Sequence, residues 1–154
     1  MNTREQFERA ISDESYRQDF VKEIDLSGAD KYVKKIVYEP KQRIYPNGNT
    51  PIMDTRMPLR AHFNISGGRS NIHVYPEAFN KKVHFVLDDF LSTLIDHEIL
   101  GHAKFGYDGE NPFKEDEERA LRNHLELLKK RNCSPQYKTV IIRRYMVILS
   151  EELN

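Results

Sequence analysis

The chain has 154 residues, in which 24 lysines and arginines balance 24 aspartates and glutamates. This length suits one domain spanning residues 1–154, and the zero net charge gives no electrostatic reason to expect nucleic acid or a membrane as a partner. The single cysteine, Cys133, has no second cysteine with which to form an intrachain disulfide. Because the N-terminus is polar and no long apolar run follows, we expect a cytoplasmic protein, or one exported without a cleavable signal peptide.

The first half of the chain is predicted to contain one helix, strands and a long loop. Thr3 and Gln6 form a capping box for a helix that runs to about Glu23. β-Branched and aromatic residues predict a strand over residues 32–38, and repeated prolines indicate an irregular connection over residues 40–58.

A hairpin is predicted next. Residues 60–65 and 71–75 have strand composition, and the intervening segment, SGGRS, is typical of an enlarged hairpin loop. Residues 83–86 fit either a further short strand or a lead into the following helix, and the sequence leaves this choice open. That helix is expected to have Asp88 or Asp89 as its N-cap.

The helix expected over residues 89–105 carries the most informative pattern. Five apolar residues recur at helical spacing and define a buried stripe: Leu87, Phe90, Leu91, Leu94 and Ile95. The same stripe continues to Glu98, Gly101 and His102. A carboxylate and an imidazole in buried positions need a partner such as a metal ion.

Two further helices are predicted in the last third of the chain. One covers residues 115–131, and its leucine-rich core face also carries Glu117 and His124. The other begins at Ser134, an N-cap followed by proline. Residues 139–142 are also compatible with a strand.

The histidines of the first of these three helices have an unusual spacing. Zinc peptidases commonly carry His-Glu-x-x-His, in which a separation of four residues places both imidazoles on one helix face. Here the block HEILGH separates His97 from His102 by five, which in a regular α-helix turns them about 140° apart. We therefore predict a π-type turn that absorbs the extra residue, made easier by Gly101.

The block HEILGH resembles the HELLGH zinc motif of the dipeptidyl peptidase III family. That family's second motif, EECRAE, supplies the third zinc ligand from its second glutamate, and the segment DEERAL of residues 116–121 is similar to it without gaps. The resemblance implies a gluzincin-type zincin with Glu117 as a zinc ligand. It covers about residues 89–128, and the two motifs lie closer together here. The tract EERALRNHLELLKK also resembles the glutamate helix of small metallopeptidase domains in bacterial effectors and toxins.

These residues define a candidate site for zinc (Zn2+). His97, His102 and Glu117 are the expected ligands, and Glu98 is the expected general base that takes a proton from the attacking water. Asp116 is expected to orient a ligand imidazole. The candidates for an oxyanion donor are His124, Tyr107 and Tyr145. The candidates for contacts with an extended substrate, added as a strand at a sheet edge, are Asn71, His73 and Tyr75.

The combined prediction is an α+β, zincin-like domain in which a small, mostly antiparallel sheet packs on the two motif helices. It would hydrolyse a peptide or protein substrate with zinc, without nucleic acid or membrane as a partner. Three alternatives remain: a zinc-binding module without hydrolytic activity, a secreted effector or toxin protease, and a chance motif in which the histidines are ordinary helix residues and Glu117 is one charge of a solvated helix start.

Overall fold

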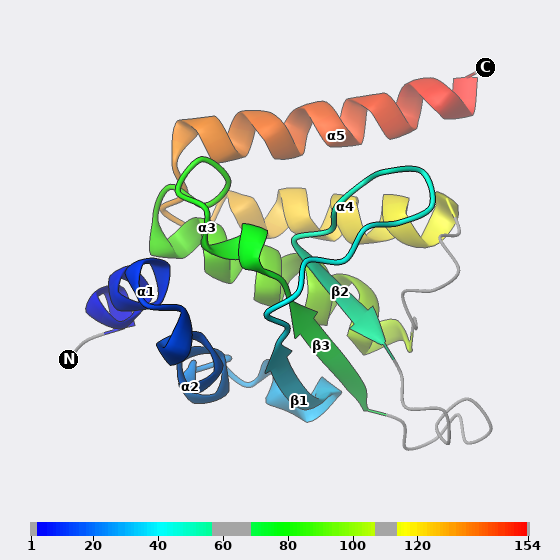
Figure 1. Cartoon of the computed structure of the whole chain (residues 1–154). Coiled ribbons are helices and arrows are strands. Elements are labelled where there is room, and N and C mark those ends of the chain that lie inside the picture. The colour runs from blue at the N-terminus through cyan, green and yellow to red at the C-terminus, as the bar shows by residue number, and fades with distance from the viewer. Residues whose placement is uncertain (1–2, 57–68, 107–113, 154) are drawn as a thin grey trace.

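The computed structural model describes residues 3–56, 69–106 and 114–153. Within these residues five α-helices and a three-stranded mixed sheet form an α+β arrangement (Figure 1). The helices are α1 (Thr3–Ser12), α2 (Arg17–Glu23), α3 (Leu87–Leu91), α4 (Lys114–Leu128) and α5 (Pro135–Leu153). A π-helical segment, η5, covers Ser92–His102, and short 3-10 segments cover Glu14–Tyr16, Ala29–Tyr32, Pro76–Phe79 and Ala103–Phe105. No helix in the described part of the chain is both long and apolar enough to cross a membrane.

The sheet has the strand order β1-β3-β2, with β1 at Val33–Tyr38, β2 at Met53–Arg56 and β3 at Ser70–Val74. β3 pairs parallel with β1 and antiparallel with β2, so the expectation of a mostly antiparallel sheet is wrong. β1 and β3 confirm two predicted strands, whereas residues 60–65 lie outside the described residues. β2 was not predicted. Flanking prolines mark its segment as irregular, but the strand forms because its first three residues are buried.

The N-terminal segment forms two helices instead of the single predicted one. Asp13 separates them, because its backbone is extended and its carboxylate accepts a hydrogen bond from the backbone N–H of Ser15. This break allows both helices to contribute an aromatic ring to the core. The ring centroids of Phe7 and Phe20 each lie 5.4 Å from that of Phe90, on α3.

The segment before α3 consists of turns, so residues 83–86 lead into the helix and do not form a strand. Val86 is the N-cap, and Asp89 lies three residues further along. The Asp89 carboxylate accepts hydrogen bonds from the backbone N–H groups of Phe85 and Val86, and also from the hydroxyl of Ser134. Ser134 precedes α5 as predicted, and residues 139–142 are helical.

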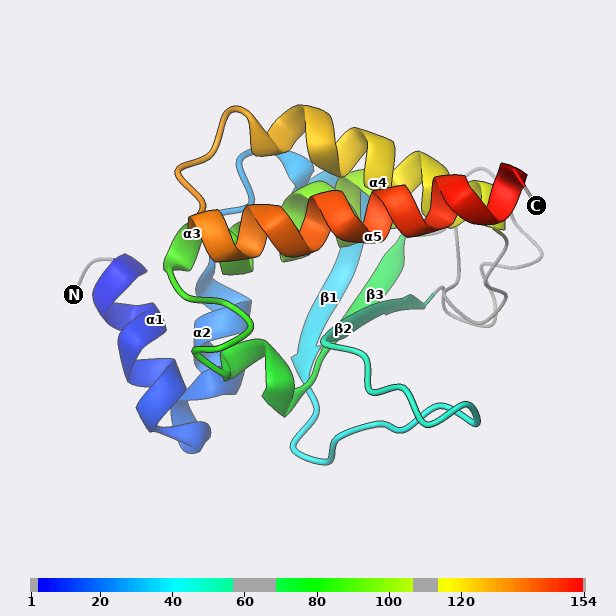
Figure 2. The same cartoon turned by 90° about the horizontal axis from the view of Figure 1, so that it is seen from above.

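The helices that follow the sheet are stacked in layers. η5 packs beside β2, α4 packs against η5, and α5 packs against α4 (Figures 1 and 2). The main apolar core lies between the sheet, the N-terminal helices and η5. A smaller apolar cluster joins α4 to α5 through Leu128, Cys133, Tyr137 and Ile141. This layering places α4 directly over the helix that carries the histidine motif.

Candidate metal centre

The π-helical winding of η5 brings the two separated histidines together. The prediction of a π-type turn is confirmed, and the π-helical segment is longer than the single turn expected. In a π-helix the backbone hydrogen bonds join residues five apart, as the bond from the N–H of Ala103 to the carbonyl of Glu98 does here. Residues at that separation therefore lie above one another. The Nε2 atoms of His97 and His102 are 3.3 Å apart.

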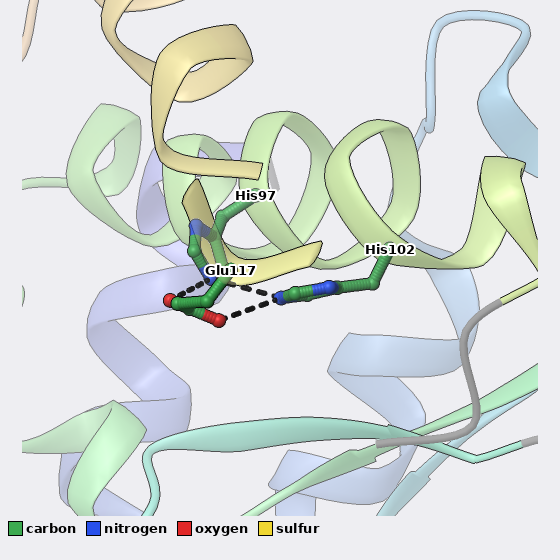
Figure 3. Close-up of side chains that lie close together, drawn as sticks. All are labelled: His97, His102 and Glu117. Carbon is green, nitrogen blue, oxygen red and sulfur yellow. Dashed lines mark hydrogen bonds and ion pairs between the residues drawn. The ribbon is translucent and has the colours of Figure 1, made fainter. Parts of the chain in front are cut away.

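Glu117 reaches the same point from α4. Figure 3 shows its carboxylate facing both imidazoles, with Oε1 3.3 Å from Nε2 of His97 and Oε2 3.1 Å from Nε2 of His102. One ligand atom from each of the three residues lies within 4.8 Å of the others. A tetrahedral zinc ion with bonds of about 2.0–2.1 Å holds neighbouring ligand atoms about 3.3 Å apart. The group is therefore compatible with a metal ion.

Asp116 forms a hydrogen bond behind one of the imidazoles. Its Oδ2 lies 2.8 Å from Nδ1 of His102, which leaves Nε2 of that ring directed at the cluster. Burial disfavours a charged imidazole, but the carboxylates of Asp116 and Glu117 outweigh burial and raise the pKa of His102 to about 10. Burial likewise opposes a charged Glu117, yet His97 and His102 hold the pKa of its carboxyl far below the usual range. The cluster is thus built to stabilise positive charge between carboxylates.

Glu98 lies beside this cluster on the side of the sheet. Its side chain is 7% exposed, and its Oε2 accepts a hydrogen bond of 2.7 Å from the hydroxyl of Thr55, on β2. Burial raises the pKa of the Glu98 carboxyl, while His97 and His102 act in the opposite direction. Sequence analysis missed Thr55 because no local pattern in a proline-flanked segment reveals that it faces the motif helix.

The three candidate oxyanion donors have different positions. His124 is buried behind His97, with their ring centroids 5.2 Å apart, and its Nε2 contacts the hydroxyls of Ser92 and Tyr137. Burial is the main cause that lowers the pKa of His124 to about 2, so this ring is neutral. Tyr145 packs under the guanidinium of Arg122, with 5.9 Å between Cζ of Arg122 and the ring centroid. Tyr107 lies outside the described residues.

Arg144 is a cationic residue at the site that sequence analysis missed. Its Nη2 lies 3.6 Å from Oε1 of Glu117, and 58% of its side chain is exposed. It extends from α5, one residue before Tyr145. Helical periodicity within α5 could not identify it, because that pattern does not reveal which face packs over α4.

The predicted substrate edge is wrong. Residues 71–75 include β3, which is the central strand and is paired on both sides, so it has no free edge for an added strand. Asn71 and His73 lie on this strand, where His73 pairs with Glu39 at 2.8 Å. Tyr75 follows the strand, and its hydroxyl donates to Asp54. Among the described residues, β2 has a neighbouring strand on one side only.

Comparisons with protein-family models, with curated proteins and with solved structures found no match. We therefore infer the function from the chemistry of this site.

Proposed function

We propose that this chain is a zinc-dependent peptidase of the zincin type, with His97, His102 and Glu117 as metal ligands. The observation that carries the proposal is the convergence of these three side chains from two helices, within 4.8 Å, in a helix wound to correct the histidine spacing. A buried carboxylate, Glu98, lies beside them. Two ordinary helix histidines need neither a π-helix nor a shared carboxylate partner.

Zinc suits this group of donors. Two imidazoles and one carboxylate are a common ligand set of catalytic zinc sites, in which the fourth position is left for water or substrate. When bound, zinc supplies Lewis-acid chemistry that polarises a scissile carbonyl and makes water a stronger nucleophile. The Asp116 carboxylate holds His102 with Nε2 directed at Glu117 and the proposed metal position.

Glu98 is the general base in this proposal. Thr55 occupies one oxygen of its carboxylate, so the other oxygen takes the proton from the attacking water and returns it to the leaving amine. Burial raises the pKa of Glu98, which favours its temporary protonation during this transfer.

We assign to Arg144 the role of stabilising the negative charge that develops on the substrate carbonyl oxygen. Its guanidinium contacts the site through Glu117 and is exposed enough to reach a bound peptide. A fixed cation at such a position stabilises the charge that develops in the transition state. His124 is hydrogen-bonded behind His97 and is the less suitable donor.

The test combines metal analysis with one conservative variant. Protein purified without chelator should contain close to one zinc per chain, and should cleave members of a proteome-derived peptide library. Glu98→Gln should keep zinc and fold while it lowers cleavage by about a hundredfold to ten-thousandfold. Glu118→Gln is the matched control, because Glu118 is also largely buried but pairs with Arg122 and is not one of the proposed ligands. Absence of bound metal contradicts the proposal, and zinc without cleavage by the wild-type chain would identify a non-hydrolytic zinc module.

A further inference from the structure

An unusual group of charges lies on and around β2, next to the candidate catalytic site. Four side chains converge on one oxygen of a buried carboxylate, Oδ2 of Asp54. Arg43 contacts it at 3.0 Å, Arg56 at 3.2 Å, Tyr75 at 2.8 Å and Tyr45 at 3.4 Å. These five residues are called the arginine cluster below.

The arginine cluster has an excess of positive charge. Two guanidinium groups share one carboxylate, which is 6% exposed and lies at the bottom of the cluster. Glu39 contacts His73 at 2.8 Å, and no contact between Glu39 and either arginine is found among the described residues. One more anion would balance the charges.

The arginines also have hydrogen-bond donors to spare. Their side chains are 32% and 31% exposed, so both reach solvent, and Nε of Arg56 is buried without a hydrogen-bond partner among the described residues. The planar guanidinium fork matches the two oxygens of a carboxylate. A carboxylate ligand would therefore balance the charge and accept hydrogen bonds from the guanidinium groups where they reach solvent.

The position of the cluster relates it to the reaction. Asp54 and Arg56 flank Thr55, whose hydroxyl binds the proposed general base, Glu98. Because side chains alternate along a strand, Asp54 and Arg56 project from the face of β2 opposite to that of Thr55. Burial, with the carboxylates of Asp54 and Glu98, raises the pKa of Tyr45 to about 12, so Glu98 is within electrostatic reach of the cluster. An extended peptide paired with the open edge of β2 would direct alternate side chains to the face of Glu98 and to the face of the arginines.

We propose that Arg43 and Arg56 form a subsite for a carboxylate of the substrate, so that the peptidase prefers acidic peptides. The inference rests on the proposed peptidase function and adds a substrate class to it. The carboxylate belongs either to an acidic side chain or to the C-terminus of the peptide, and the experiment separates these two sources. If instead the cluster only holds residues 43–45 against the sheet, substrate charge has no effect.

Four N-acetylated alanine-based hexapeptides provide the test. Each carries one central Glu or Gln, and each is made with a free or an amidated C-terminus. Titration calorimetry on the zinc-loaded Glu98→Gln variant gives binding without cleavage, and the wild-type chain gives kcat/KM. The peptide with Gln and an amidated C-terminus has no carboxylate and is the reference. We expect a peptide whose carboxylate enters the subsite to bind about tenfold more tightly than this reference. High salt should remove the difference. A preference for Glu with the amide identifies a side-chain subsite, whereas a preference for Gln with the free acid identifies a C-terminal subsite.

Arginine variants test whether Arg43 and Arg56 cause the preference for a carboxylate. Arg43→Gln and Arg56→Gln should each remove most of the carboxylate advantage, whereas Arg4→Gln, an equal charge change on the exposed face of α1, should retain it. If an arginine variant unfolds, the comparison of peptides on the unmodified cluster still decides the question. Equal binding of all four peptides overturns the subsite even where cleavage occurs. Charge-dependent binding without any cleavage leaves the subsite standing and contradicts the peptidase.

Discussion

Gly101 and Ala120 lie in such close contact that a Cβ built on Gly101 would be 2.9 Å from the Cβ of Ala120. This contact joins η5 to α4, the two elements that carry His102 and Glu117. Gly101→Ala must therefore push α4 outwards and move Glu117 away from the imidazoles. We predict a loss of zinc affinity of about tenfold or more and a destabilisation of about 1–3 kcal/mol, measured by chelator competition and by urea unfolding.

A compensating substitution makes this prediction specific. Ala120→Gly loses helix propensity worth about 1 kcal/mol, but it removes the closest contact of a methyl group at position 101 and leaves the Cα of residue 120 at 3.1 Å. The double variant, Gly101→Ala with Ala120→Gly, should recover most of the zinc affinity while remaining less stable than the wild-type chain. If Gly101→Ala alone binds zinc like the wild type, this contact does not position Glu117.

The residues of the candidate metal centre could be predicted from the sequence because their information is local. The spacing of His97 and His102 requires a helix distortion, and the π-helix provides it. The stripe that includes Glu117 follows from the leucine spacing of α4, whereas Glu118, about 100° further round the helix, pairs with Arg122. Helical periodicity shows which residues share a face of a helix. The proposed metal ligands lie on the faces that this periodicity identifies in η5 and α4.

The residues that sequence analysis missed depend on how elements pack together. Thr55 reaches Glu98 only because β2 lies beside η5, and Arg144 reaches Glu117 only because α5 covers α4. The central position of β3 depends on a parallel pairing with β1, which brings together residues far apart in the sequence. Such pairings leave no periodic pattern in a single segment.

Thr55→Val tests whether the hydroxyl positions the general base. Valine keeps the shape of the side chain but removes the hydrogen bond of 2.7 Å to Glu98. We predict a loss of about tenfold in kcat with little change in KM or in bound zinc, because misorientation of Glu98 affects the proton transfer and not substrate binding. Thr55→Ser restores the hydroxyl and should recover most of kcat. A fall in zinc content, or no difference between the two variants, contradicts a positioning role.

Arg144→Gln tests the assignment of the cation at the site. We predict a fall in kcat of about a hundredfold, the size typical for loss of one oxyanion donor. Zinc affinity should stay the same or increase, because the variant removes a positive charge 3.6 Å from the ligand Glu117. Arg143→Gln, at an exposed neighbouring position on α5, is the control and should keep full activity. Equal losses in the two variants would point to a general effect of charge.

His84 should make stability depend on pH. The ring is fully buried, its Nδ1–H donates to the carbonyl of Ala78 at 2.6 Å, and its Nε2 lies 2.8 Å from the hydroxyl of Thr93. Burial lowers its pKa to about 4 against the opposing effects of Ala78 and Asp89, whereas the pKa of a histidine in an unfolded chain is about 6.5. Between these pH values the unfolded chain binds more protons than the native chain, so the free energy of unfolding falls as the pH falls.

The size of this effect follows from the linkage relation. The loss is about 1.4 kcal/mol for each pH unit within the window, and it is absent above pH about 7, where both states are neutral at this residue. His84→Asn keeps a donor for the Ala78 carbonyl but cannot be protonated. Urea unfolding at several pH values should show a shallower decline for the variant than for the wild type, although the variant is less stable at neutral pH. Because His124 and the metal ligands are unchanged, their contributions cancel in the difference, and parallel curves for the two proteins would rule out His84 as the source.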